Sequence, residues 1–130
     1  MIQDFFFLRI NRKYVRLDIA SLVYIEAKGT YTKLFLSNGT SLLAHTKLKD
    51  WERLLPPALF LRINKSYILN LSKVSAFNVE VAWIGDKAFK VARDRRQALT
   101  HHQSVVIDAP SMQPVHRTAI ETMSSELQLN

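Results

Sequence analysis

Short stretches in which apolar and polar residues alternate fill most of the first 92 residues. Alternation with a period of two, rich in β-branched and aromatic residues, is typical of β-strands that bury one face. The stretches expected to form strands are 5–10, 13–18, 22–27, 31–36, 41–45, 59–63, 67–70, 74–77, 79–84 and 88–92. So many short strands predict a mostly β domain.

Turn signals stand between several of these strands. Asn11-Arg12 is a two-residue link between the first two strands, and Gly85-Asp86 separates the last two. Asn38-Gly39 is the strongest hairpin signal in the chain, because both residues readily adopt the backbone of a tight β-turn. Antiparallel hairpins are therefore expected at these three places.

Two short helices are expected beside the strands. The apolar residues at helical spacing are Leu48, Trp51, Leu54 and Leu55. Thr46 can cap this helix at its start, and Pro56-Pro57 ends it, because proline cannot continue a helix. Residues 94–102 predict a second, basic helix in which Ala98 and Leu99 are available for packing.

The character of the chain changes near residue 102. Residues 103–130 are polar, contain two prolines and show only a weak helical pattern at 118–127. We expect a domain over residues 1–102 and a C-terminal tail over 103–130. The tail could equally be an arm that docks on the domain or on a second copy of the chain.

Charge adds a candidate partner to this picture. The 130 residues hold 18 Lys plus Arg and 11 Asp plus Glu, a formal net charge of +7. Residues 1–100 carry 17 of the basic and 8 of the acidic residues, a net +9. A basic body favours a polyanionic partner such as nucleic acid, although excess Lys and Arg can also serve solubility alone.

Other classes of protein are disfavoured. There is no cysteine, which excludes disulfides and thiolate chemistry, and 48% of the residues are hydrophobic, enough for a folded core. No apolar run is long enough to span a membrane, and residues 1–4 do not resemble a signal peptide. We expect a cytoplasmic protein that binds no membrane.

No catalytic constellation is visible in the sequence. The four histidines are His45, His101, His102 and His116. They show no metal-ligand spacing such as His-Glu-x-x-His, and the three glycines stand at predicted turns rather than in a phosphate-binding loop. We therefore expect a protein that is not an enzyme and needs no metal or cofactor.

Basic residues recur beside turns and strand ends in three separate stretches. They are Lys28, Lys33, Arg62, Lys65, Arg93, Arg95 and Arg96. If these stretches converge at one edge of a sheet, they form a cationic rim that can contact phosphates and guanine edges in duplex DNA. The alternative is scattered surface charge with intramolecular ion pairs.

Two further kinds of binding remain open at this stage. A basic rim also suits a protein-interaction module that binds an acidic partner. Binding of single-stranded nucleic acid would need exposed aromatic rings beside the basic residues, and Tyr14, Tyr31 and Tyr67 are the candidates.

Five segments taken together resemble the LytTR family of DNA-binding domains. The resembling segments are 7–17, 19–34, 46–56, 60–70 and 91–96, in order and with the family's spacing. The most specific is Phe60-Leu61-Arg62-Ile63-Asn64-Lys65-Ser66-Tyr67-Ile68-Leu69-Asn70. The resemblance covers about residues 5–100, so it assigns residues 1–102 to a LytTR-like domain.

This resemblance implies an elongated, multi-stranded antiparallel β fold with short flanking helices. It further implies a sequence-specific transcriptional regulator whose loops enter successive major grooves of double-stranded DNA. Two copies usually bind a direct repeat, and many members are output domains of two-component response regulators. A receiver domain or a histidine kinase pathway is thus an implied partner.

The resemblance also assigns roles by position. Base contacts fall to Thr32, Lys65 and Arg93. Phosphate contacts fall to Lys33, Arg62, Ser66 and Arg96, with Lys28, Asn64 and Arg95 in support.

Two departures from the family pattern affect these expectations. Asn64-Lys65-Ser66 stands where the family often has His-Arg-Ser. Lysine keeps the charge but lacks the forked guanidinium, so base preference at Lys65 is expected to be looser or different. No acidic phosphoacceptor pocket precedes residue 5, so we expect a stand-alone member or a domain taken from a longer regulator.

Overall fold

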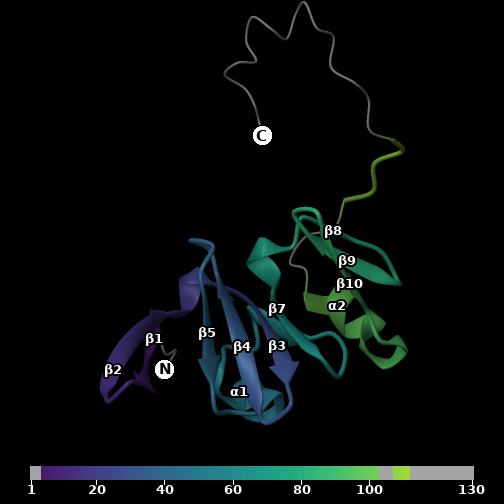
Figure 1. Ribbon diagram of the computed structural model, residues 1–130. Helices are drawn as coiled ribbons and strands as arrows, with labels where there is room; N and C mark the ends of the chain where they lie inside the picture. Colours follow the sequence, from purple (N-terminus) through teal and green to yellow (C-terminus); the bar gives the residue numbers. More distant parts are fainter. Residues whose placement is uncertain (1–3, 103–106, 112–130) are drawn as a thin grey trace, which may run out of the picture.

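The strands pair into three antiparallel sheets in the part of the chain that the computed structural model describes, residues 4–102 and 107–111 (Figure 1). The strands are β1 (Phe5–Ile10), β2 (Lys13–Asp18), β3 (Leu22–Lys28), β4 (Tyr31–Leu36), β5 (Ser41–Ala44), β6 (Phe60–Arg62), β7 (Tyr67–Asn70), β8 (Ala76–Phe77), β9 (Val81–Ile84) and β10 (Lys87–Lys90). The sheets have the orders β1-β2, β5-β4-β3-β7-β6 and β10-β9-β8. The predicted mostly β class is confirmed.

The three predicted hairpins form where the turn signals stand. Asn11 and Arg12 both have positive φ, 50° and 67°, as a two-residue turn between antiparallel strands requires. Gly39 has φ 88° between β4 and β5, and Gly85 has φ 59° between β9 and β10. Asn38 strengthens its turn, because its Oδ1 accepts a hydrogen bond from the Thr40 amide at 3.0 Å.

Both predicted helices exist, with different starts. Helix α1 spans Leu48–Leu54, and its N-cap is Lys47, whose side chain makes no capping bond. The prediction that Thr46 caps this helix is wrong, because the helix starts one residue later and the Thr46 carbonyl accepts a bond from the Thr32 hydroxyl. The second helix begins as a 3₁₀ turn, η3 (Arg93–Arg95), and continues as α2 (Arg96–His102).

The last strand is shorter than its apolar pattern suggests. Strand β10 ends at Lys90, although apolar residues continue to Ala92. The Val91 amide donates to the Glu80 carbonyl at 2.8 Å, and the Ala92 amide donates to the Ile63 carbonyl at 2.8 Å. The second of these bonds leaves the small sheet and ties the start of η3 to the connection between β6 and β7.

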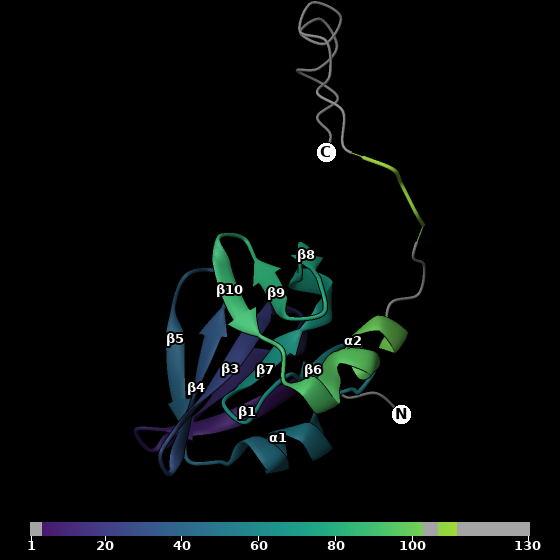
Figure 2. The same ribbon diagram turned by 90° about the vertical axis from the view of Figure 1, so that its right-hand side faces the viewer.

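Two hydrophobic clusters hold the sheets together. The first joins the β1–β2 hairpin, the five-stranded sheet and α1, with Trp51 only 2% exposed at its centre. The second joins β6 and β7 to the small sheet and α2 through Ile63, Phe89 and Leu99. The hairpin lies at one end of the molecule, and the small sheet with α2 lies at the other (Figures 1 and 2).

Within residues 4–102 and 107–111, none of the helices has the length and apolar character needed to cross a lipid bilayer.

Candidate nucleic-acid interface

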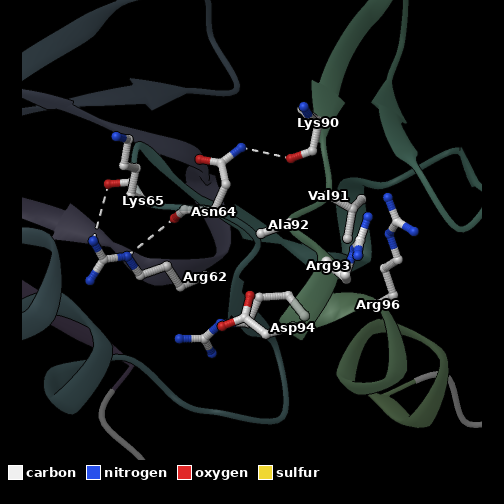
Figure 3. Close-up of a pocket in the computed structure, with 10 residues that line it drawn as sticks. Arg62, Asn64, Lys65, Lys90, Val91, Ala92, Arg93, Asp94 and Arg96 are labelled. Carbon is white, nitrogen blue, oxygen red and sulfur yellow. Dashed lines mark hydrogen bonds between the residues drawn. The ribbon is translucent and has the colours of Figure 1, made fainter.

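A groove of about 580 Å³ brings together two of the three basic stretches. We call it the main groove. It is lined by Arg62, Asn64, Lys65, Lys90, Val91, Ala92, Arg93, Asp94, Arg95 and Arg96 (Figure 3). Six of these side chains are basic and one is acidic, so the groove is suited to an anionic partner.

Asn64 fixes the shape of the loop that carries Lys65, which comprises residues 63–66 and which we call the 63–66 loop. The Asn64 Oδ1 accepts hydrogen bonds from the amides of Ser66, at 2.7 Å, and Tyr67, at 3.0 Å. Its Nδ2 donates to the Lys90 carbonyl at 2.6 Å (Figure 3). One amide side chain therefore folds the loop and attaches it to the end of β10.

Arg62 supports the same loop from the other side. Its Nε donates to the Asn64 carbonyl at 3.2 Å, and one terminal nitrogen donates to the Lys65 carbonyl at 3.0 Å. The other terminal nitrogen lies 3.3 Å from a carboxylate oxygen of Glu52 in α1. The guanidinium is thus engaged on all three nitrogens, which leaves it little capacity for a phosphate.

Three cations of the main groove remain available to a partner. Lys65, Lys90 and Arg93 are exposed, and no ion pair or hydrogen bond engages their side chains within the described residues. Figure 3 shows Arg93 and Arg96 on the same side of the groove. The Arg96 Nε is buried and has no hydrogen-bond partner among the described residues, so this nitrogen is itself closed to an external ligand.

A smaller hollow of about 220 Å³ lies next to the main groove. We call it the side pocket. It is lined by Ala27, Gly29, Tyr31, Thr32, Lys47, Leu48, Lys49, Arg62 and Lys65. Because Arg62 and Lys65 line both hollows, the side pocket and the main groove meet at the 63–66 loop.

The first stretch is placed differently from the prediction. Thr32 is only 1% exposed, its hydroxyl donates to the Thr46 carbonyl, and the same oxygen accepts from the Trp51 Nε1 at 2.9 Å. A base contact by Thr32 is therefore incompatible with this conformation. The signal was present in the sequence, because Thr32 shares the inward face of β4 with Leu34, which is completely buried.

Lys28 and Lys33 line neither hollow. Lys33 follows Thr32 along β4 and so points to the opposite face of the sheet, where its Nζ lies 5.1 Å from the Phe35 ring centroid. Lys28 lies 3.8 Å from a carboxylate oxygen of Glu26, which pairs in register with Lys33. These two predicted residues are thus not among the cations that line the hollows.

An aromatic cluster covers that opposite face. Tyr24 stacks on Phe35 at 4.2 Å between centroids, and Tyr24 and Tyr67 both make edge contacts with Phe89. Burial is the main cause that raises the pKa of the Tyr67 hydroxyl above 10.0, followed by its hydrogen bond to Glu26. Burial also raises the pKa of Tyr24. These rings are part of the packing between two sheets.

Three lysines that line the hollows were not predicted as site residues from the sequence. Lys90 ends β10, and Lys47 and Lys49 flank Leu48 at the start of α1. Each of these lysines is next to an apolar residue that is buried, Leu48 or Val91. This pattern in the sequence could have indicated that they are exposed, since residues next to a buried position commonly face solvent. Among the described residues, no three His, Cys, Asp or Glu side chains are grouped so that they could hold a metal ion.

Comparison with known proteins identifies relatives of this fold. The family model of the LytTr DNA-binding domain matches residues 12–104. The CO-responsive transcriptional regulator RcoM of Rhodospirillum rubrum is 40% identical over 60 residues, which cover 46% of this chain and 25% of that regulator. The chain thus spans about a quarter of the regulator that it matches.

A solved structure has the same fold. It is the LytTr DNA-binding domain of a methyl-accepting/DNA response regulator from Bacillus cereus, with a TM-score of 0.65 at 16% identity. The likeness covers 79% of this chain and 99% of that one, which confirms the predicted fold. Because the family model covers well over half of the sequence, this chain belongs to the LytTr family of DNA-binding domains.

Proposed function

We propose that the chain is a sequence-specific regulator of transcription that reads double-stranded DNA through Lys65 and Arg93. The observation that carries this proposal is the meeting of two basic segments, far apart in sequence, at the main groove. Two hydrogen bonds fix them together, from the Ala92 amide to the Ile63 carbonyl and from Asn64 to the Lys90 carbonyl. The similarity to a transcriptional regulator supports the regulatory role.

The exposed side chains suit readout of base edges. Arg93 presents a forked guanidinium that matches the O6 and N7 acceptors of guanine in the major groove. Lys65 projects from a loop whose backbone is fixed by Asn64 and Arg62, so the point from which its side chain extends is held in a defined place. Lysine is a point charge, so a weaker base preference is expected at Lys65 than at Arg93.

Phosphate contacts orient the protein in this proposal. Arg96 and Ser66 lie at the groove and the 63–66 loop, with Arg95 in support, and they would bind the backbone on either side of Arg93. Arg62 and Asn64 act as positioning residues. Thr32, Lys28 and Lys33 make no base or phosphate contact in this proposal.

Two copies on a direct repeat, each with loops in the major groove, complete the proposal. Half-sites about one helical turn apart would place both copies on one face of the duplex. The link to a two-component pathway rests on family resemblance, supported by the name of the Bacillus relative. A reporter gene driven by the selected DNA site tests that link. Its expression should change when the histidine kinase of the pathway is deleted.

Selection from a random duplex library in about 150 mM salt, followed by a gel shift with the recovered sequence, tests the function. The proposal expects a motif with two half-sites about one helical turn apart. If the selection enriches no sequence, the proposal of specific DNA recognition is overturned. Saturable binding of an acidic protein instead of DNA would favour an interaction module with a basic rim.

A further inference from the structure

We propose that the side pocket is a second DNA-backbone site, which holds a phosphate strand next to the main groove at the 63–66 loop. This inference rests on the proposed function and extends it. It assigns phosphate contacts to Lys47 and Lys49, and a flanking contact to the stacked pair of Tyr31 and His45.

The charge of the side pocket favours the binding of an anion. Four of its lining residues are basic, Lys47, Lys49, Arg62 and Lys65, and none of the described residues that line it is acidic. Lys47 and Lys49 are exposed and make no ion pair or hydrogen bond through their side chains within the described residues. Two positive charges therefore face solvent without compensation.

Neighbouring carboxylates do not cancel these charges. The two acidic residues of α1 are already engaged elsewhere. Asp50 lies 3.1 Å from a guanidinium nitrogen of Arg53, and Glu52 lies 3.3 Å from that of Arg62. The uncompensated lysines are thus attractive to an external anion.

An aromatic pair stands at the edge of this pocket. Tyr31 at the start of β4 stacks on His45, just after the end of β5, with ring centroids 4.7 Å apart and planes inclined by 27°. Tyr31 is 46% exposed. A phenol hydroxyl and an imidazole N–H are both donors that can bind phosphate oxygens, and stacking restricts the motion of both rings.

The chemistry of the pocket favours a phosphate strand over a base. Its cations are mostly lysines, which bind phosphate as point charges and lack the fork that matches a base edge. Ala27, Gly29 and Leu48 offer no side-chain donors or acceptors for base recognition. Thr32, the one aliphatic hydroxyl in the lining, is engaged with Trp51 and Thr46.

The position of the pocket explains why a second backbone contact is useful. The side pocket and the main groove share Arg62 and Lys65, so two basic hollows meet at Lys65 of the 63–66 loop. Phosphates held in both hollows would fix the depth and orientation of the loop on the duplex. Lys65 would then meet base edges in one register.

The test replaces both lysines in the full chain, Lys47→Gln with Lys49→Gln, and measures affinity against salt concentration. A selected duplex and a scrambled duplex are compared. We expect roughly tenfold weaker binding to both at about 0.15 M salt, with a salt slope shallower by about 2, since each lost phosphate contact removes about 0.9. The preferred base sequence should not change.

A matched variant controls for the loss of charge alone. Lys13→Gln with Lys73→Gln removes the same charge from positions that line neither hollow. This control should keep the wild-type salt slope. Tyr31→Phe should weaken both duplexes by a smaller factor, because it removes only the hydroxyl from the stacked pair.

The outcomes separate this inference from the proposed function. If the double Lys47/Lys49 variant keeps the wild-type slope while Arg96→Gln flattens it, DNA binds without the side pocket and the inference is wrong. If the wild-type chain binds no duplex, the proposed function itself fails. Thermal melting of each variant confirms that it is folded.

Discussion

The side chain of Asn64 makes three hydrogen bonds where two distant segments of the chain meet. It accepts from the amides of Ser66 and Tyr67 and donates to the Lys90 carbonyl. No charged residue of the main groove joins so many backbone groups. The position of Lys65 in the 63–66 loop therefore depends on an uncharged neighbour.

Asn64→Ala should lower the free energy of unfolding by about 1–3 kcal/mol, because it leaves backbone groups without their partner. Urea denaturation measures this change. Asn38→Ala is the matched control, since Asn38 also folds a turn but in an exposed hairpin. Its expected cost is below about 1 kcal/mol. Equal effects of the two substitutions would contradict the role of Asn64.

Tyr67 links stability to alkaline pH. Burial and the bond to Glu26 raise the pKa of its hydroxyl in the folded state above 10.0. A group whose pKa is raised by folding stabilises the protein fully below its unfolded pKa and loses that contribution as the pH rises through its folded pKa.

Wild-type stability should therefore fall above pH 10 more steeply than the stability of Tyr67→Phe, which has no hydroxyl to ionise. Urea denaturation between about pH 8 and 11 gives both curves. Parallel curves would show that Tyr67 titrates alike in the folded and unfolded states.

Elements of the fold were predictable where local chemistry determines them. Asn11-Arg12, Asn38-Gly39 and Gly85-Asp86 marked the hairpins, because tight turns need residues that tolerate a left-handed backbone. The ends of elements were less predictable. Strand β10 stops at Lys90 because the following amides bond to Glu80 and Ile63, which no local pattern reveals.

Helix α1 is attached to β4 by a hydrogen bond that sequence patterns cannot show. The Trp51 Nε1 donates to the Thr32 hydroxyl, which in turn donates to the Thr46 carbonyl just before the helix. This pair of bonds fixes the start of α1, and with it Lys47 and Lys49, beside β4. Thr32 is thus a structural residue at a position for which the family resemblance implied a base contact.

Thr32→Val should destabilise the fold by about 1–3 kcal/mol, because a buried indole N–H and a carbonyl both lose their partner at almost unchanged volume. Thermal and urea denaturation check this value. Thr40→Val provides a control in an exposed turn and should have a smaller effect. A fully stable Thr32→Val variant would refute the structural role of Thr32.

The convergence of basic segments is a property of the whole molecule. The sequence showed that cations stand beside turns, but the meeting of residues 62–66 with 90–96 depends on how the small sheet packs against β6 and β7. The stretch that holds Lys28 and Lys33 lines the side pocket only with uncharged residues, Ala27, Gly29, Tyr31 and Thr32. Packing between two separate sheets therefore decided which predicted residues share a surface.

The extent of the domain can be tested by truncation. Both hydrophobic clusters of the described residues end by Leu99, and the family match ends at residue 104. A chain of residues 1–104 should keep the melting temperature within a few degrees and the full affinity for DNA. A large loss of either would show that residues 105–130 belong to the folded unit; the predicted tail lies mostly outside the described residues.

The ratio of specific to non-specific affinity tests the central claim, readout of duplex DNA through Arg93, most directly. This ratio is measured by gel shift at one salt concentration, with the selected duplex and a scrambled one, for the wild type and Arg93→Ala. Loss of a bidentate contact costs about 1–3 kcal/mol, so the ratio should fall roughly 5- to 150-fold. An unchanged ratio in a folded Arg93→Ala protein would contradict the account.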